Sequence, residues 1–217
     1  SPYTLSLHDA LPIYVWDKKV KAMVNWWLET VGTVNGQKKA PSHIYYMRDG
    51  VSEGQYLQVL NDEVKWFKDM LETVNPQFKQ TKFVVVIASK RHHIRFLPRN
   101  EDQCKDKDFN PLPGVLVEHD ITHPFQYDFY LNAHKAIKGT ARPVHYHVIL
   151  DEVKHKPGQL QEMIYAHSYQ YMRSTTPVSI HPAVYYAHLA SNRARSHENV
   201  PIVDEPRGGQ KAMERRQ

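Results

Sequence analysis

The segment KFVVVIAS, at residues 82–89, constrains the fold of this chain more than any other stretch. It is apolar at six consecutive positions and rich in β-branched residues, so an extended chain here would present apolar side chains on both faces. Such a strand is stable only between two layers that cover it. We therefore expect a central strand in a mixed sheet with helices on both sides, which is an α/β layered domain.

Apolar residues recur at helical spacing in two segments before that strand, 17–33 and 55–74, and in two after it, 158–172 and 182–195. A charged, proline-containing stretch at 99–114 is expected to be a loop. The other strand candidates are HIYYMR (43–48), IRFLP (94–98), GVLVEHDI (114–121), FQYDFYLNA (125–133) and VHYHVILDE (144–152). We expect IRFLP to pair with the central strand.

The two ends differ from the rest of the chain. We expect residues 1–13 to be a sequencing-adapter artefact, because SLHDALPI (6–13) is what one common adapter encodes in one reading frame. Residues 201–217 are polar and contain proline and glycine, so we expect a disordered tail. The domain itself is then expected to occupy residues 14–200.

The composition of the chain limits which binding partners and which cellular compartment we expect. The single cysteine, Cys104, excludes an internal disulfide and fits a reducing compartment, so we expect a cytoplasmic protein, with the nucleus as a second candidate compartment. The sequence has no stretch of about 18 apolar residues, so no membrane-spanning helix is predicted. The formal net charge of +5 leans towards polyanionic partners, although a solubilising surface is the preferred interpretation of the charge alone.

Asp49 lies where an apolar strand candidate gives way to the turn-like sequence DGVSEG. A carboxylate at a strand end faces the rim of a sheet, where α/β proteins place their sites, and it could hold a metal ion. Asp-Gly is also a common turn pair, and a helix cap or turn residue is the simpler interpretation of Asp49 alone.

A basic segment, SKRHHIRF (89–96), follows the central strand. In an extended chain Arg91, His93 and Arg95 would share one face and suit a chain of phosphates. A solvated edge whose charges deter strand pairing is an equally good interpretation.

Two further segments carry histidines. His145 and His147 lie on one face of a strand candidate, at a spacing that can ligate zinc, but hydrogen-bonded histidines inside a sheet are the preferred interpretation. Arg142, next to Pro143, is the better functional candidate there. In the last predicted helix Tyr185 and His188 lie on one stripe, too polar to be pure core.

Several long blocks together resemble the PIWI domain of eukaryotic Argonaute proteins, in that family's order and spacing. They are YYMRDGVSEGQ, VVIASKRHHIRF, ITHP…YDFYL, AHKAIKGTARPVHYHVILDE and VSIHPAVYYAHLASNRAR. The loop NEDQCKDKDFNPLPG and the ending RARSHEN look closest to fungal members. The resemblance covers roughly residues 16–200 and implies an RNase H-like fold, a mixed sheet flanked by helices.

The resemblance also implies a function, which is cleavage of RNA directed by a small guide RNA. The reaction is a two-metal hydrolysis of the paired target RNA that uses Mg²⁺. It implies that Asp49 and His188 are catalytic and metal-binding. The positions that match guide-binding residues are Lys90, Arg95, His134, Arg142, Arg173, Ser179, Tyr185 and Arg193. Arg193 matches the arginine that reaches the 5′ phosphate of the guide.

The family's active site needs four groups, an Asp, a Glu, an Asp and a His, and this sequence supplies the last two. Asp9 has the wrong context for the first aspartate, and Asp17 is near the expected glutamate but in an uncertain register. We therefore expect a PIWI domain truncated at both ends that does not itself cleave RNA. MID and PAZ domains are expected in the intact protein.

Three hypotheses follow. The parent protein is a guide-directed nuclease, or it is a non-slicing Argonaute that binds a guide and recruits partners. The third hypothesis, independent of the family, is a zinc protein built on His145 and His147. The resemblance also implies tryptophan-rich scaffold proteins as partners. Phe67 and Tyr130 could line such a pocket, but a core role for these aromatics is preferred.

Overall fold

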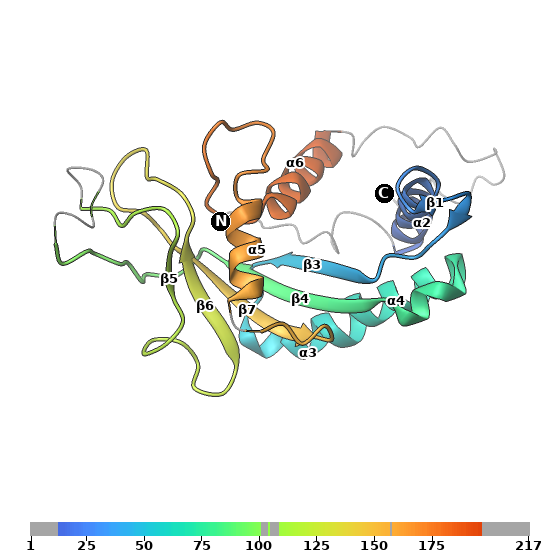
Figure 1. Cartoon of the computed structure of the whole chain (residues 1–217), viewed down its shortest axis with the longest axis horizontal. Helices are drawn as coiled ribbons and strands as arrows, with labels where there is room; N and C mark the ends of the chain where they lie inside the picture. The colour runs from blue at the N-terminus through green and yellow to red at the C-terminus, as the bar shows by residue number, and fades with distance from the viewer. Residues whose placement is uncertain (1–12, 101–103, 105–108, 157, 197–217) are drawn as a thin grey trace, which may run out of the picture.

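The computed structural model describes residues 13–100, 104, 109–156 and 158–196, apart from the side chains of residues 13–18, 34 and 195. Its centre is a five-stranded mixed sheet in the order β3-β4-β7-β6-β5 (Figure 1). β3 runs parallel to β4, and the other neighbouring pairs are antiparallel. The strands are β3 (His43–Asp49), β4 (Lys82–Ser89), β5 (Val115–Val117), β6 (Tyr127–Asn132) and β7 (Val144–Asp151).

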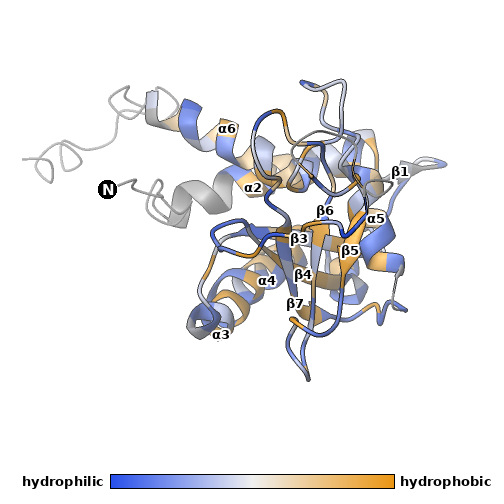
Figure 2. Ribbon diagram, turned by 90° about the vertical axis from the view of Figure 1, so that its left-hand side faces the viewer, coloured by the Kyte–Doolittle hydropathy of each residue, from blue (hydrophilic) through white to orange (hydrophobic). Residues whose placement is uncertain are grey.

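β4 is the strand predicted to need cover on both faces, and the structure confirms this. Six consecutive residues, 83–88, are each no more than 1% exposed. Val84, Val86 and Ala88 join one apolar core, while Phe83, Val85 and Ile87 join a second core on the opposite face. β4 therefore lies between two cores, and Figure 2 shows apolar residues concentrated in the strands.

Helices cover both faces of the sheet (Figure 1). α5 (Gln159–His167) and α6 (Pro182–Ser196) pack on the core that contains Val84. α2 (Ile13–Thr30) and α4 (Lys65–Val74) pack on the core that contains Phe83. None of the helices in the described part of the chain is long and apolar enough to cross a membrane.

The predicted helices are present, but their bounds differ. α2 begins and ends a few residues earlier than the predicted 17–33, and α5 stops at His167 rather than at residue 172. Ser168 caps the carboxyl end of α5, where its hydroxyl donates to the Tyr165 carbonyl at 2.6 Å.

The helix predicted over 55–74 is not uniform. A 3₁₀ turn, η1 (Glu53–Gln55), and a short α segment, α3 (Tyr56–Gln58), lead into a π-helical segment, η2 (Val59–Val64). α4 then completes it, and a second 3₁₀ turn, η3 (Pro76–Gln80), links it to β4.

The prediction that IRFLP pairs with the central strand is wrong, because no strand forms over residues 94–98. β4 already has β3 on one edge and β7 on the other, so neither edge is free for a further strand. Residues 94–98 instead run beside β6, where the Phe96 ring lies edge-on to Tyr130 at 5.8 Å.

A small hairpin was not predicted. β1 (Thr33–Val34) pairs antiparallel with β2 (Gln37–Lys38). Asn35 and Gly36 between them have φ of 52° and 76°, the left-handed values that a two-residue hairpin turn requires. The Asn-Gly pair in the sequence is a known signal for this turn.

Candidate functional site

Asp49 and His188, 139 positions apart in the sequence, meet in the structure. Asp49 is the last residue of β3 and His188 lies on α6. The His188 Nε2–H donates to Asp49 Oδ2 at 2.7 Å. The side chain of His188 is 50% exposed and that of Asp49 is 35% exposed, so a ligand can reach the pair from solvent.

The structure does not support a helix-capping role for Asp49. Ser52 precedes η1, and both its backbone N–H and its hydroxyl donate to the Gln55 side chain. Arg48, the neighbour of Asp49 on the opposite face of β3, is held by Glu63, with Nε 3.0 Å from Oε2. The Asp49 carboxylate is therefore left to face α6.

A second group of predicted residues gathers at the same edge of the sheet. Lys90 directly follows β4, and Lys90 Nζ donates to Ser179 Oγ at 2.6 Å. Ser179 Oγ in turn lies 2.8 Å from the Tyr185 hydroxyl. Because β3 and β4 are parallel and Asp49 pairs with Ala88, Asp49 and Lys90 both lie at the carboxyl ends of neighbouring strands.

Lys90 also interacts electrostatically with two further predicted residues, Arg142 and His134. Burial, and then the nearby Arg142 guanidinium, lower the pKa of the Lys90 ammonium group below its ordinary value. Burial, with the Lys90 charge adding to it, lowers the pKa of His134 to about 4. His134 is therefore neutral at pH 7. We call Lys90, His134, Arg142, Ser179 and Tyr185 the cationic cluster.

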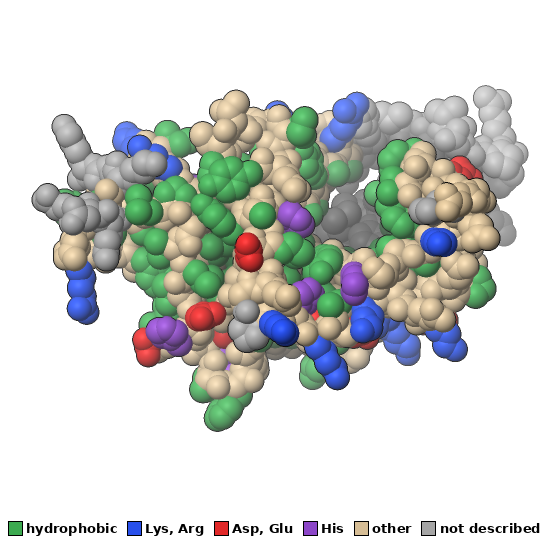
Figure 3. Space-filling model, in the orientation of Figure 1, with side chains coloured by type: hydrophobic (Ala, Val, Ile, Leu, Met, Phe, Trp, Pro, Cys, Tyr) green, Lys and Arg blue, Asp and Glu red, His purple; other side chains and the backbone are tan. Residues whose placement is uncertain are grey.

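The cationic cluster has no anion of its own. Within the described ranges, neither Lys90 nor Arg142 forms an ion pair with a carboxylate. The buried His134 Nδ1 has no hydrogen-bond partner either. Figure 3 shows Lys and Arg side chains mainly along the edges of this view rather than as one continuous patch.

The other predicted contact residues are not in this cluster. The Arg95 guanidinium donates to the backbone carbonyls of His92 and Ile94, at 3.2 and 2.6 Å. The row of three basic side chains expected from an extended 91–95 therefore does not form as predicted, although Arg91 and His93 are exposed. Arg173 is exposed on the segment after α5, and Arg193 is exposed on α6.

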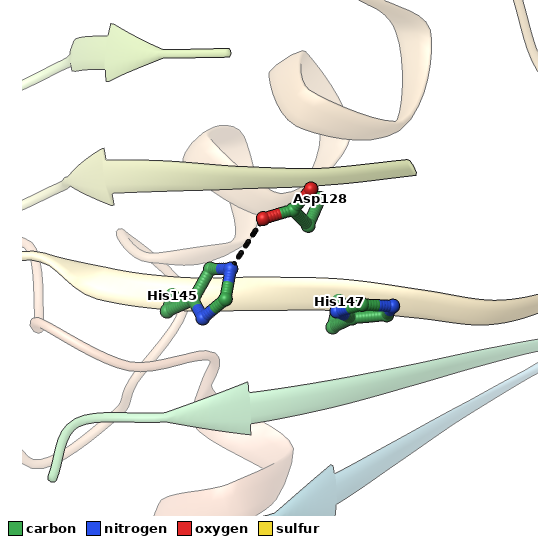
Figure 4. Close-up of side chains that lie close together, drawn as sticks. All are labelled: Asp128, His145 and His147. Atoms are coloured by element: carbon green, nitrogen blue, oxygen red, sulfur yellow. Dashed lines mark hydrogen bonds and ion pairs between the residues drawn. The ribbon is translucent and has the colours of Figure 1, made fainter. Parts of the chain in front are cut away.

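One candidate residue, Asp128, was not predicted from the sequence. It lies on β6 beside His145 and His147 of β7, and the three could share a metal ion (Figure 4). The alternation of YDFYL places Asp128 on one face with Tyr130, but only the strand pairing shows that this face meets the histidines. Tyr130 is 6% exposed and stacks on His145, as the preferred core role predicted.

Comparison with known proteins gives one consistent result. The Piwi domain family model matches residues 16–199. Over 158 residues the chain is 46% identical to "Protein argonaute" of Schizosaccharomyces pombe, covering 73% of this chain and 19% of that protein.

Two solved structures give the same fold. One is the C-terminal lobe of a budding yeast Argonaute, with a TM-score of 0.70 and 30% identity, covering 82% of this chain and 36% of that one. The other is Kluyveromyces polysporus Argonaute with a guide RNA, with a TM-score of 0.68 and 32% identity, covering 80% and 22%. The chain spans less than a fifth of the length of the curated relatives it matches.

Proposed function

Because the chain belongs to the Piwi domain family of Argonaute proteins, with the RNase H-like fold of that domain, we propose that it binds the backbone of a small guide RNA in RNA silencing. The observation that carries the proposal is the cationic cluster. The charge of Arg142 contributes to the lowered pKa of Lys90, so the two positive groups repel each other. Neither forms an ion pair with a carboxylate among the described residues.

A phosphodiester would relieve this arrangement. A phosphate oxygen accepts hydrogen bonds from an ammonium and from a guanidinium, and its negative charge offsets the repulsion between them. The hydroxyls of Ser179 and Tyr185 offer two more neutral hydrogen-bonding groups within the same cluster. All of these contacts are to the backbone of a nucleic acid, so the bases stay free to pair with a target.

Arg95, Arg173 and Arg193 extend the proposal beyond the cluster. Arg173 and Arg193 are exposed and can approach an RNA without desolvation of a buried charge. We assign Arg193 to the 5′ phosphate of the guide, together with a MID domain in the parent protein. Arg95 would need to exchange its bonds to backbone carbonyls for a phosphate.

The Asp49–His188 pair supports a second, chemical role only in part. A carboxylate oxygen is a ligand that Mg²⁺ prefers, and the Asp49 carboxylate is accessible. Among the residues that the structure describes, no third carboxylate, imidazole or thiolate lies in position to share an ion with this pair. One carboxylate and one imidazole do not fit a two-magnesium centre, so these residues alone do not support hydrolysis.

Asp17 lies in α2, but its side chain is outside the described ones. We therefore assign target cleavage to a longer parent protein that adds two carboxylates. The alternative is a parent that binds a guide without cleaving and recruits partners. The short ligand set around Asp49 is the observation that keeps this alternative open.

The experiment is equilibrium binding of a fluorescently labelled single-stranded RNA by the purified chain. Lys90→Ala and Arg142→Ala should each weaken binding by about 10- to 150-fold, since a charge-assisted contact is worth about 1.5–3 kcal/mol. Lys65→Ala is the matched control, because it removes the same charge from an exposed side chain of α4, on the opposite face of the sheet. Two RNAs of unrelated sequence should bind equally. Equal losses in all three variants would refute a local site.

A further inference from the structure

A group of three side chains lies on the face of the sheet opposite Asp49. In the pairing of β6 with β7, Asp128 is directly opposite His147, and Tyr130 is opposite His145. Cross-strand partners share a face, and His147 pairs with Ile87 of β4, which belongs to the core under α4. Asp49 pairs with Ala88, which belongs to the other core.

The three side chains lie close together, and His145 points to Asp128 (Figure 4). His145 Nε2 and Asp128 Oδ2 are 2.6 Å apart, and one ligand atom from each of the three residues lies within 4.8 Å of the others. The second oxygen of Asp128 accepts the His123 backbone N–H at 2.9 Å. That bond fixes the orientation of the carboxylate, as the outer partners of metal ligands commonly do.

His147 is the residue that a sheet of hydrogen-bonded histidines does not explain. It is 4% exposed, and its buried Nδ1 has no hydrogen-bond partner among the described residues. The ring of Tyr56 lies 4.8 Å away and limits access to water. A buried imidazole nitrogen without a hydrogen-bond partner is unusual in a folded protein, and such a nitrogen can serve as a metal ligand.

The donor set indicates the class of ion. Two imidazole nitrogens and one carboxylate oxygen are typical of zinc and of its transition-metal neighbours, not of Mg²⁺ or Ca²⁺. At metal–ligand distances of about 2.0–2.2 Å, neighbouring ligand atoms in a tetrahedron are about 3.3 Å apart. The His145–Asp128 pair would have to widen by less than 1 Å, and the ion would replace the proton that they now share.

We propose that Asp128, His145 and His147 form a zinc-class metal site with three protein ligands, separate from the Asp49–His188 pair. Three ligands leave a fourth position for water. An ion there would link β6 to β7 beside the Tyr56 ring, so it would stabilise the sheet rather than act on RNA.

The experiment counts zinc bound to the purified chain. After a chelator has removed metals, the protein is loaded with zinc chloride, dialysed against metal-free buffer and measured by elemental analysis. We expect one zinc per chain, and Asp128→Asn and His147→Gln should each weaken binding by roughly tenfold or more. Cobalt in place of zinc should give the intense visible bands of a tetrahedral site.

Two control variants locate the ion. His155→Gln removes a histidine that bonds to Asp151 in the same chain, and Asp49→Asn alters the other candidate site. Both should retain one zinc. Circular dichroism checks that Asp128→Asn and His147→Gln remain folded. The proposal is overturned if the wild-type chain retains no zinc, or if these two variants retain as much as the wild type, since the ion would then sit on other histidines of the fourteen.

Discussion

Ser179 is the residue on which the cationic cluster depends most directly. It is 4% exposed, and its hydroxyl accepts from Lys90 and contacts the Tyr185 hydroxyl. Ser179 is the one hydrogen-bond acceptor of Lys90 among the described residues, and a half-buried ammonium group that loses its acceptor bears the cost of its own desolvation. This position therefore links the stability of the fold to the charge that would meet a phosphate.

We expect Ser179→Ala to lower the free energy of unfolding by about 1–3 kcal/mol, because Lys90 is left without that acceptor. Chemical denaturation followed by circular dichroism measures it. Ser191→Ala, a serine-to-alanine substitution on α6, is the control and should change stability by no more than about 0.5 kcal/mol. Equal effects of the two substitutions would show that the Lys90–Ser179 bond contributes nothing.

The residues of the two candidate sites differ in how far the sequence could predict them. Asp49, His188 and the cationic cluster were named from family blocks, and the structure brings them to one edge of the sheet. Asp128 was not named, because an aspartate in a strand gives no local signal of what lies across the sheet. The register of β6 with β7 carries that information, and register is a property of the folded chain.

At the scale of elements, the start of α6 depends on the protonation of His181. Its Nδ1 accepts the Ala183 backbone N–H at 3.2 Å, so the ring proton is on Nε2, which lies 2.9 Å from His167 Nδ1. Burial, and then the charge of His167, lower the pKa of His181 to about 4. A second proton would occupy Nδ1 and break the contact that caps α6.

This gives a pH dependence with a definite sign. The unfolded chain binds the His181 proton near pH 6.5 and the folded chain only near pH 4. The stabilising contribution is therefore complete above pH 6.5 and is lost as the pH falls from 6.5 to 4, by about 1–3 kcal/mol. His181→Asn keeps a capping side chain at this position without a titrating ring.

Denaturation midpoints at pH 7 and pH 5 measure this effect, and the fall in stability should be smaller in His181→Asn than in the wild type. His134, with a pKa of about 4, contributes a fall of its own that remains in both proteins. An identical fall in the two proteins would contradict the assignment to His181.

Element types were predicted better than element bounds. Periodicity located the helices that cover the sheet, yet it did not show the π segment at Val59–Val64, which keeps nearly the same apolar spacing. The false strand at 94–98 has strand-like composition. Its exclusion depends on which edges of β4 are taken, and that is decided by distant segments.

For the whole molecule, β4 joins two cores into one unit. Leu160 of α5 is fully buried in one core, and Leu71 of α4 is 1% exposed in the other. All four tryptophans are in α2 or α4, and Trp27 and Trp66 pack against the core that contains Leu71. Tryptophan fluorescence therefore reports on one core, while circular dichroism reports on both.

We expect Leu160→Ala to cost about 2–5 kcal/mol, and to shift the tryptophan-fluorescence transition as much as the circular dichroism transition. Because the two cores share β4, loss of packing on one face should unfold the other. Leu71→Ala is the matched substitution on the tryptophan side and should behave alike. Separate fluorescence and dichroism midpoints in Leu160→Ala would show that the faces unfold independently.

The most direct test of the proposed guide-backbone binding is the salt dependence of RNA affinity. Each phosphate contact contributes a slope of about −0.7 in a plot of log affinity against log salt concentration for a single strand. Because Lys90 and Arg142 are proposed to hold the same phosphodiester, the double substitution Lys90→Ala and Arg142→Ala should make that slope shallower by about 0.7, and by the same amount for RNAs of unrelated sequence. Parallel lines for the wild-type and doubly substituted chains would contradict the claim that this cluster holds the phosphates.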